Sequence, residues 1–304
     1  MLLNLPLGIS VASPAEATYE YVRIQVFSTD SVNESPDASA SITATGASVR
    51  ATPGGSDLTG TWTAAGTTGG SPANLGDSNG RTVWTDKSLM SDITDRWFQI
   101  QLDTPSVIRE VTYVNNSGGD IFVPRIAAIL GSNDGVNFDL IWAETELPAV
   151  SGASTSVWTR SEAKEALTLY RLRALTTYIT GDFLGCAEQV WKDSLGDSIP
   201  GNAFAGIYTI SDSFVASKTR DGNGSTFYTS GAKFETGGNF IGIATTSDKV
   251  PANIDYTVRA DSFREDPKDY FIEKSVDFGA TWTSLASGTE SAWTAGETRT
   301  ISIT

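Results

Sequence analysis

The sequence contains a long internal repeat, and this repeat constrains the architecture more than any other feature. Residues 77–84 follow the pattern D-x-N-G-x-T, then one further residue and an aromatic, and residues 221–228 repeat it. Residues 97–100 and 240–243 keep nearly the same offset. A repeat of roughly 145 residues is far longer than the 20–50 residues of solenoid repeats. We therefore predict two copies of one whole domain.

Both copies are rich in strand patterns. Short runs of β-branched and aromatic residues, bounded by Gly, Pro, Asn and Asp, predict strands at 21–27, 97–102, 107–114, 125–130, 240–244, 254–259, 270–273 and 299–303. The only helical window is 161–169, and residues 28–76 predict either long loops or weakly paired edge strands. The predicted fold class is all-β, with two tandem β-sandwich domains.

The length of 304 residues fits two domains of about 150 residues each. The second copy opens near Thr168, so we predict a first sandwich at residues 19–167 and a second at 168–304. No Pro/Gly-rich linker separates them, and we expect the two domains to be fixed relative to each other.

Residues 1–18 precede the first copy. They include an apolar run, but Pro6 interrupts it and no Lys or Arg comes before it, unlike a signal peptide. We expect a short N-terminal arm that docks on a partner. An uncleaved signal-like segment is the alternative.

Charge and composition exclude several function classes. The net charge of -15 disfavours nucleic acid and anionic membranes as partners. No apolar stretch approaches the length of a transmembrane helix. The chain has no histidine and a single cysteine, Cys186, so Ser-His-Asp and Cys-His catalysis and an intrachain disulfide are excluded. We find no nucleophile with a base, and predict that the protein is not an enzyme.

Several motifs together resemble a known family. The D-x-N-G-x-T loop, the aromatic strand at 97–100 and the G-S-N-D-G-V-N-F segment at 131–138 occur in this order, with a weaker copy of the last at 274–282. They resemble the discoidin, or coagulation factor type C, family of galactose-binding-like jelly-roll sandwiches. The resemblance covers nearly all of residues 19–304. The Tyr-Arg strand that opens each copy looks like the modules of bacteriophage tail and virion proteins.

The D-x-N-G-x-T loops are candidate calcium sites, because they concentrate side-chain and carbonyl oxygens. The resemblance implies a structural Ca²⁺ held by this loop and a distant glutamate. The candidate ligands are Glu188, Asp221, Asn223, Ser225 and Thr226 in the second copy and Asp77, Asn79 and Thr82 in the first. The counterpart of Glu188 falls near Ala40, which weakens the first site. The alternative is a tight turn in which Asp and Asn cap their own backbone.

Three aromatic residues are candidate glycan platforms. Trp62, Trp191 and Tyr208 lie in loop-like surroundings that differ between the copies. An exposed ring packs on the C–H face of a sugar. For each of them local packing is the favoured interpretation, and a sugar platform is the alternative. Trp84, Trp97, Trp158, Trp282 and Trp293 occupy repeat-equivalent positions and are expected in the core.

The preferred functional hypothesis is a non-enzymatic virion structural protein, from a phage tail or a capsid surface. Its arm would dock on other virion proteins, and its duplicated modules would serve assembly and bind host glycans. We expect a homo-oligomer, as is common for such proteins. The alternatives are a secreted or cell-surface bacterial carbohydrate-binding protein, and an architectural protein without a ligand.

Overall fold

The computed structural model describes residues 16–31, 42–65, 71–76, 84–86, 97–115, 122–145, 147, 154–161, 164, 166–178, 184–205, 216–229, 239–260 and 265–303. Among these residues no α-helix occurs. All strand pairings between the named strands are antiparallel. The predicted all-β fold class is confirmed.

The first sandwich contains two sheets. One has the strand order β3-β5-β1-β7-β8 and the other β4-β2-β6-β9. The elements are β1 (Tyr19–Ser31), β2 (Ile42–Arg50), β3 (Gly60–Ala64), the 3₁₀ helix η1 (Pro72–Gly76), β4 (Trp84–Asp86), β5 (Trp97–Ser106), β6 (Glu110–Asn115), β7 (Phe122–Ser132), β8 (Asp139–Glu144) and β9 (Thr155–Thr159).

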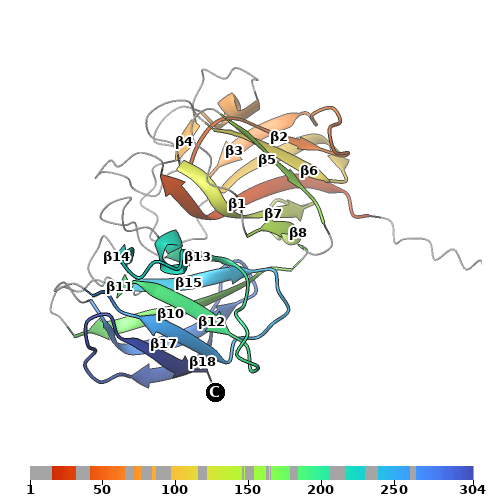
Figure 1. Cartoon of the computed structure of the whole chain (residues 1–304). Helices are drawn as coiled ribbons and strands as arrows, with labels where there is room; N and C mark the ends of the chain where they lie inside the picture. The colour runs from red at the N-terminus through yellow and green to blue at the C-terminus, as the bar shows by residue number, and fades with distance from the viewer. Residues whose placement is uncertain are drawn as a thin grey trace, which may run out of the picture.

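The second sandwich repeats this topology. Its five-stranded sheet has the order β13-β15-β10-β17-β18, and β12-β16-β19 and β11-β14 face it. The elements are β10 (Thr168–Thr177), β11 (Gly185–Cys186), β12 (Glu188–Lys192), β13 (Asn202–Ala205), the 3₁₀ helix η5 (Ala216–Arg220), β14 (Tyr228–Thr229), β15 (Asn239–Thr245), β16 (Asn253–Thr257), β17 (Pro267–Ser275), β18 (Thr283–Thr289) and β19 (Thr298–Ser302). Figure 1 shows the two sandwiches and the labelled strands.

Each sandwich has its own hydrophobic core. Alternate residues of the strands point inward, as in Val22 and Ile24 of β1 and in Tyr170 and Leu172 of β10. The first core draws its buried residues from positions 22–158 and the second from 170–301. Burying each large apolar side chain contributes about 1.5–3 kcal/mol, so each sandwich has a core sufficient to hold its two sheets together.

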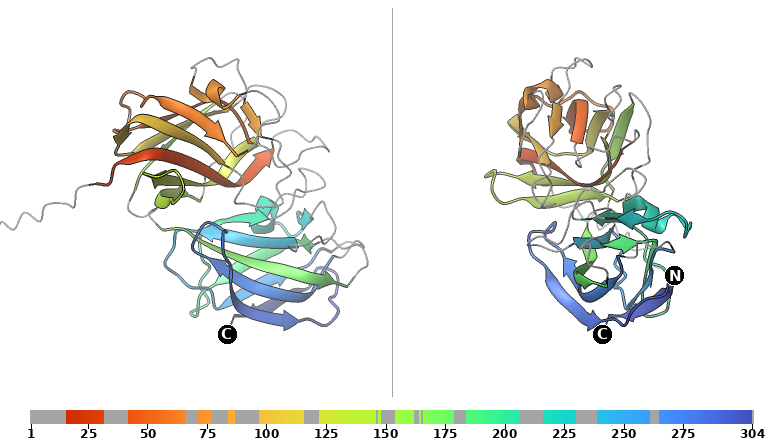
Figure 2. Two further views of the ribbon diagram at one scale, coloured as in Figure 1. Left: turned by 180° about the vertical axis from the view of Figure 1, so that it is seen from behind. Right: turned by 90° about the vertical axis from the view of Figure 1, so that its left-hand side faces the viewer.

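A third apolar cluster joins the two sandwiches. The outer face of β1, β7 and β8 contributes Phe27, Ile126, Ala128, Leu130 and Ala143, and the second sandwich contributes Leu167, Leu169, Phe204, Phe240 and Ala244, all of them buried. Figure 2 shows the sandwiches one above the other in two further views. Because interdomain motion is the default only where the interface is small or polar, this cluster favours one rigid unit.

Phe278 is a strained residue at this interface. Asp134 and Asp277 hold equivalent hairpin turns, and each accepts hydrogen bonds from backbone N–H groups that follow it in its turn. The next residue is Gly135 in the first sandwich, with φ 72°, and Phe278 in the second, with φ 61°. A left-handed conformation costs a side-chain-bearing residue about 1–2 kcal/mol. Phe278 packs against the interdomain cluster, which offsets this strain.

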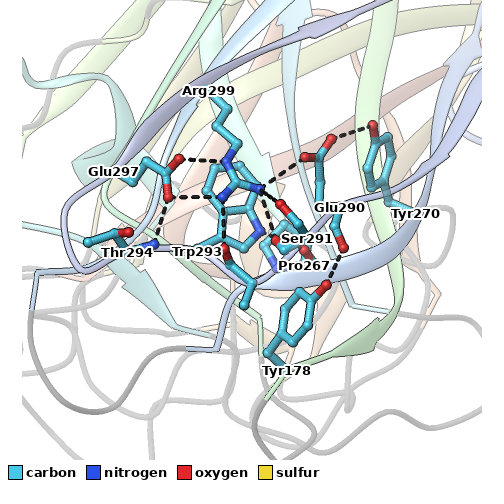
Figure 3. A network of polar contacts seen from close by, with 10 residues as sticks. Tyr178, Pro267, Tyr270, Glu290, Ser291, Trp293, Thr294, Glu297 and Arg299 are labelled. Carbon is cyan, nitrogen blue, oxygen red and sulfur yellow. Dashed lines mark hydrogen bonds and ion pairs between the residues drawn. The ribbon is translucent and has the colours of Figure 1, made fainter.

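The loop before β19 is held by one arginine (Figure 3). Arg299 binds both carboxylate oxygens of Glu297, at 2.7 and 3.0 Å, and reaches Glu290 at 3.1 Å. Its guanidinium also lies 4.2 Å from the ring centroid of Trp293 and donates to the carbonyl oxygens of Ser291 and Ala292. One side chain therefore fixes the loop and covers a core tryptophan.

The structure corrects two local expectations. Residues 42–50, within the stretch expected to be loop or edge, form β2, an interior strand between β4 and β6. Its inward side chains include the small Ala44 and Ala47, so the hydrophobic signal is weak. The prediction of a helix at 161–169 is also wrong at its C-terminal end, because β10 begins at Thr168.

Candidate cation-binding loop of the second domain

The D-x-N-G-x-T loop of the second sandwich lies between η5 and β14. It starts at Asp221, directly after η5, and ends at Tyr228, where β14 begins. Gly222 has a φ of 73°, which glycine adopts without steric cost. The glycine lets the chain turn sharply here, so that the loop lies beside Glu188 at the start of β12.

The loop side chains bind their own backbone. The Asp221 carboxylate accepts from the N–H of Asn223 at 2.9 Å and from the hydroxyl of Thr226 at 2.8 Å. The Asn223 side-chain oxygen accepts from the N–H of Ser225 at 3.2 Å. These are the Asx turns expected from Asp and Asn in such a sequence. They gather the oxygens of both side chains in one short arc.

Glu188 adds a second carboxylate to this arc. Its Oε1 is buried and has no hydrogen-bond partner. Burial raises the pKa of Glu188, the nearby carboxylate of Asp221 raises it further, and the backbone N–H groups of Asn223 and Gly222 oppose the shift. Two neighbouring carboxylates repel each other, and a cation between them relieves the repulsion.

These donors fit a hard cation such as Ca²⁺. Glu188, Asp221 and Asn223 would hold it through side-chain oxygens, and the ion would neutralise the carboxylate pair. The unpartnered Oε1 of Glu188 is the observation that favours this fit. No group of three or more His, Cys, Asp or Glu side chains gathers anywhere in the described chain, so Asn and carbonyl or hydroxyl oxygens would complete the set.

Gln189 positions this site, and the sequence did not single it out. Its side-chain amide donates to Thr219 of η5 at 2.9 Å and accepts from the indole N–H of Trp191 at 2.7 Å. All three side chains are buried. The network ties η5 to β12, and thereby sets the loop against Glu188. Gln189 and Trp191 are the inward-facing residues of β12, which only the burial pattern of the structure reveals.

The first sandwich lacks the corresponding glutamate. Asp77, Asn79 and Thr82 lie outside the described residues. In the second sandwich Glu188 pairs with Thr257, and in the first Gly46 pairs with Val114 at the equivalent register. The counterpart of Glu188 is therefore Gly46 rather than a residue near Ala40. Glycine supplies no carboxylate, so the two copies differ in the residue that matters most for a cation.

Two of the three expected glycan platforms lie in the cores. Trp191 is fully buried on β12, with its ring centroid 5.9 Å from that of Tyr170. Trp62 is 7% exposed on β3, with its ring 5.9 Å from that of Phe98. Neither ring has a free face for a sugar, so the favoured interpretation of local packing is confirmed for both and the sugar-platform hypothesis is wrong for them. Tyr208 lies outside the described residues.

Comparisons with known proteins add no relative. No family profile, no curated protein and no solved structure matches the chain. Within the described residues, no helix is long and apolar enough to cross a membrane.

Proposed function

We propose that this chain is a non-enzymatic virion structural protein, a component of a phage tail or of the capsid surface. The observation that carries the proposal is the apolar cluster between the sandwiches, which favours one stiff two-module unit over two tethered domains. A rigid two-domain unit suits a structural protein that holds its neighbours at fixed positions in a particle. The resemblance to discoidin-like virion modules supports the same role.

The proposed docking element is the N-terminal arm. At its described end, Glu16 forms ion pairs with Arg109 at 2.7 Å and with Arg160 at 3.5 Å. Arg109 directly precedes β6 and Arg160 directly follows β9. Residue 16, the described end of the arm, is therefore held at one end of the first sandwich, and we propose that the arm reaches a neighbouring virion protein from there.

The proposed role of the second-domain loop is structural. A bound Ca²⁺ would neutralise Glu188 and Asp221 and would stabilise the second sandwich without taking part in a reaction. A metal that binds the folded state alone adds its binding free energy to the stability of the fold. The lone Cys186 is buried, so it does not supply a cross-link in the folded chain.

The test is deletion of residues 1–18. Full-length and shortened proteins are compared by light scattering and by incorporation into particles of the virus that encodes the chain. The proposal predicts that the full-length protein enters particles and that the shortened protein does not, while both remain folded by circular dichroism. If both proteins stay out of particles and bind a defined sugar, the protein is a secreted carbohydrate-binding protein instead.

A further inference from the structure

The outer face of the five-stranded sheet is the face by which the second sandwich binds the first. Leu169, Phe204, Phe240 and Ala244 line it, and all four are buried in the interdomain cluster. They lie on β10, β13 and β15. The repeat provides the same face on β1, β3 and β5 of the first sandwich. In the first sandwich this face is not covered by the second sandwich to the same extent, so it is available for a ligand.

The strand registers align the two faces position by position. Arg23 pairs with Gln99, and Arg171 pairs with Gly242, at equivalent points of the two sheets. The residues that replace the apolar ones of the second sandwich are Tyr21 for Leu169, Thr63 for Phe204, Trp97 for Phe240 and Gln101 for Ala244. The first sandwich thus keeps an aromatic ring at Trp97 and gains one at Tyr21, whereas Thr63 replaces a phenylalanine by a hydroxyl and Gln101 replaces an alanine by an amide.

This face is partly open in the described structure. Thr61, Thr63 and Gln101 are exposed, and Tyr21 and Trp97 are half-buried. The apolar half of the same sheet, on β7 and β8, is the part that the second sandwich covers. In Figure 1, β7 and β8 lie next to the second sandwich, and β3 lies away from it.

The charges on this face are few, and Arg23 and Glu20 are engaged in contacts within it. The Arg23 guanidinium lies between the rings of Trp97 and Phe138, at 4.2 and 3.8 Å from their centroids, and burial lowers its pKa to about 10. The Glu20 carboxylate accepts from the Gln101 amide at 2.9 Å. Asp103 lies two residues after Gln101 on β5, and therefore on the same face of the sheet. Arg23 therefore stands against the two carboxylates of Glu20 and Asp103, and this small negative excess, on a chain of net charge -15, disfavours acidic glycans.

We infer that the outer face of β3 and β5, together with Tyr21 of β1, binds a neutral glycan. Half-exposed Tyr and Trp rings pack on the C–H face of a sugar, and neighbouring amides and hydroxyls bind its hydroxyl groups. A second protein module is a poorer fit, because Thr63 and Gln101 replace the side chains that make the apolar contact in the second sandwich. The inference rests on the proposed function, since it names the face by which the modules would bind host glycans.

The test uses a printed array of neutral and acidic glycans. Wild type is compared with Trp97→Ala and with the double variant Thr61→Ala/Gln101→Ala, whose residues are exposed and leave the core untouched. The control is Thr159→Ala, an exposed threonine on the other sheet of the same sandwich. We expect wild type to bind neutral glycans, both test variants to bind at least tenfold more weakly, and the control to bind as wild type.

Two results would overturn the inference. If wild type binds glycans and the double variant binds equally well, glycan binding stands but lies elsewhere on the chain. If wild type binds no glycan on the array, this face is not a glycan site, whereas the virion role is decided separately by incorporation into particles.

Discussion

Replacement of Glu188 by Gln tests the candidate cation site through two opposite effects. A site with two carboxylates is at the weak end of protein calcium affinities, with a dissociation constant of about 0.1–1 mM. At 10 mM Ca²⁺, binding to the folded state alone then adds about 1.4–2.7 kcal/mol to the free energy of unfolding. For a domain of this size that corresponds to a rise in melting temperature of about 5–10 °C.

The variant behaves differently in the absence of calcium. Burial and Asp221 raise the pKa of Glu188 in the folded protein, so the folded state binds more protons than the unfolded state between the two pKa values. Stability without metal is therefore highest below the ordinary Glu pKa and falls as the pH rises through the folded value. Glu188→Gln removes this loss, so at pH 7 in EDTA the variant melts higher than wild type.

Differential scanning calorimetry with EDTA and with 10 mM Ca²⁺ measures both effects. Wild type should gain several degrees on addition of calcium, and Glu188→Gln should gain less than one. Asp139→Asn, an exposed carboxylate of the first sandwich, is the matched control and should respond as wild type. An equal calcium response of wild type and Glu188→Gln would refute the reasoning.

Three further predictions concern stability. Arg299→Ala should lower the free energy of unfolding by about 1–3 kcal/mol in urea titrations, because Glu297 and Glu290 lose their charged donor; an unchanged midpoint would contradict the role of this clamp. Phe204→Thr introduces the residue type found at the equivalent position of the first sandwich, Thr63. It should weaken the interdomain cluster by about 3 kcal/mol and split the calorimetric transition in two. A single unchanged transition would show that this cluster does not couple the sandwiches. The N–H groups of Asn137 and Val136 hold the pKa of Asp134 far below its usual value. Asp134→Ala should therefore destabilise the protein at neutral pH, with the difference from wild type shrinking below about pH 4; a pH-independent difference would argue against it.

The fold class followed from the sequence because both copies carry strong strand signals. Val22 and Ile24 alternate with polar residues, and the repeat doubles each such pattern. The tryptophans show where this reasoning failed. Trp97 and Trp282 were expected in the core, yet they lie half-buried on the outer faces beside arginines, whereas Trp62 and Trp191, named as candidate sugar platforms, are buried by local packing. Position in the repeat does not reveal which face of a strand a residue occupies.

The candidate site was predictable in part. The candidate loop ligands Asp221 and Asn223 could be found from their local pattern. Glu188 came from the family resemblance, and its true counterpart Gly46 needed the sheet register, because insertions shift the two copies against each other. Gln189 could not be assigned from sequence, since its partner Thr219 is 30 residues away along the chain.

The strain at Phe278 could not be foreseen either. Its first-copy counterpart is Gly135, the residue type that a left-handed turn favours. Only the packing of the two sandwiches shows why a phenylalanine occupies this turn. Tertiary contacts there outweigh the local preference of the backbone.

Immunogold labelling of purified virus particles tests the central claim most directly. Antibodies raised against the folded two-sandwich unit are applied to intact particles and viewed by electron microscopy. The account predicts label at one defined position, on the tail or on the capsid surface. Unlabelled particles, with the protein recovered from the culture medium in free form, would contradict the structural role.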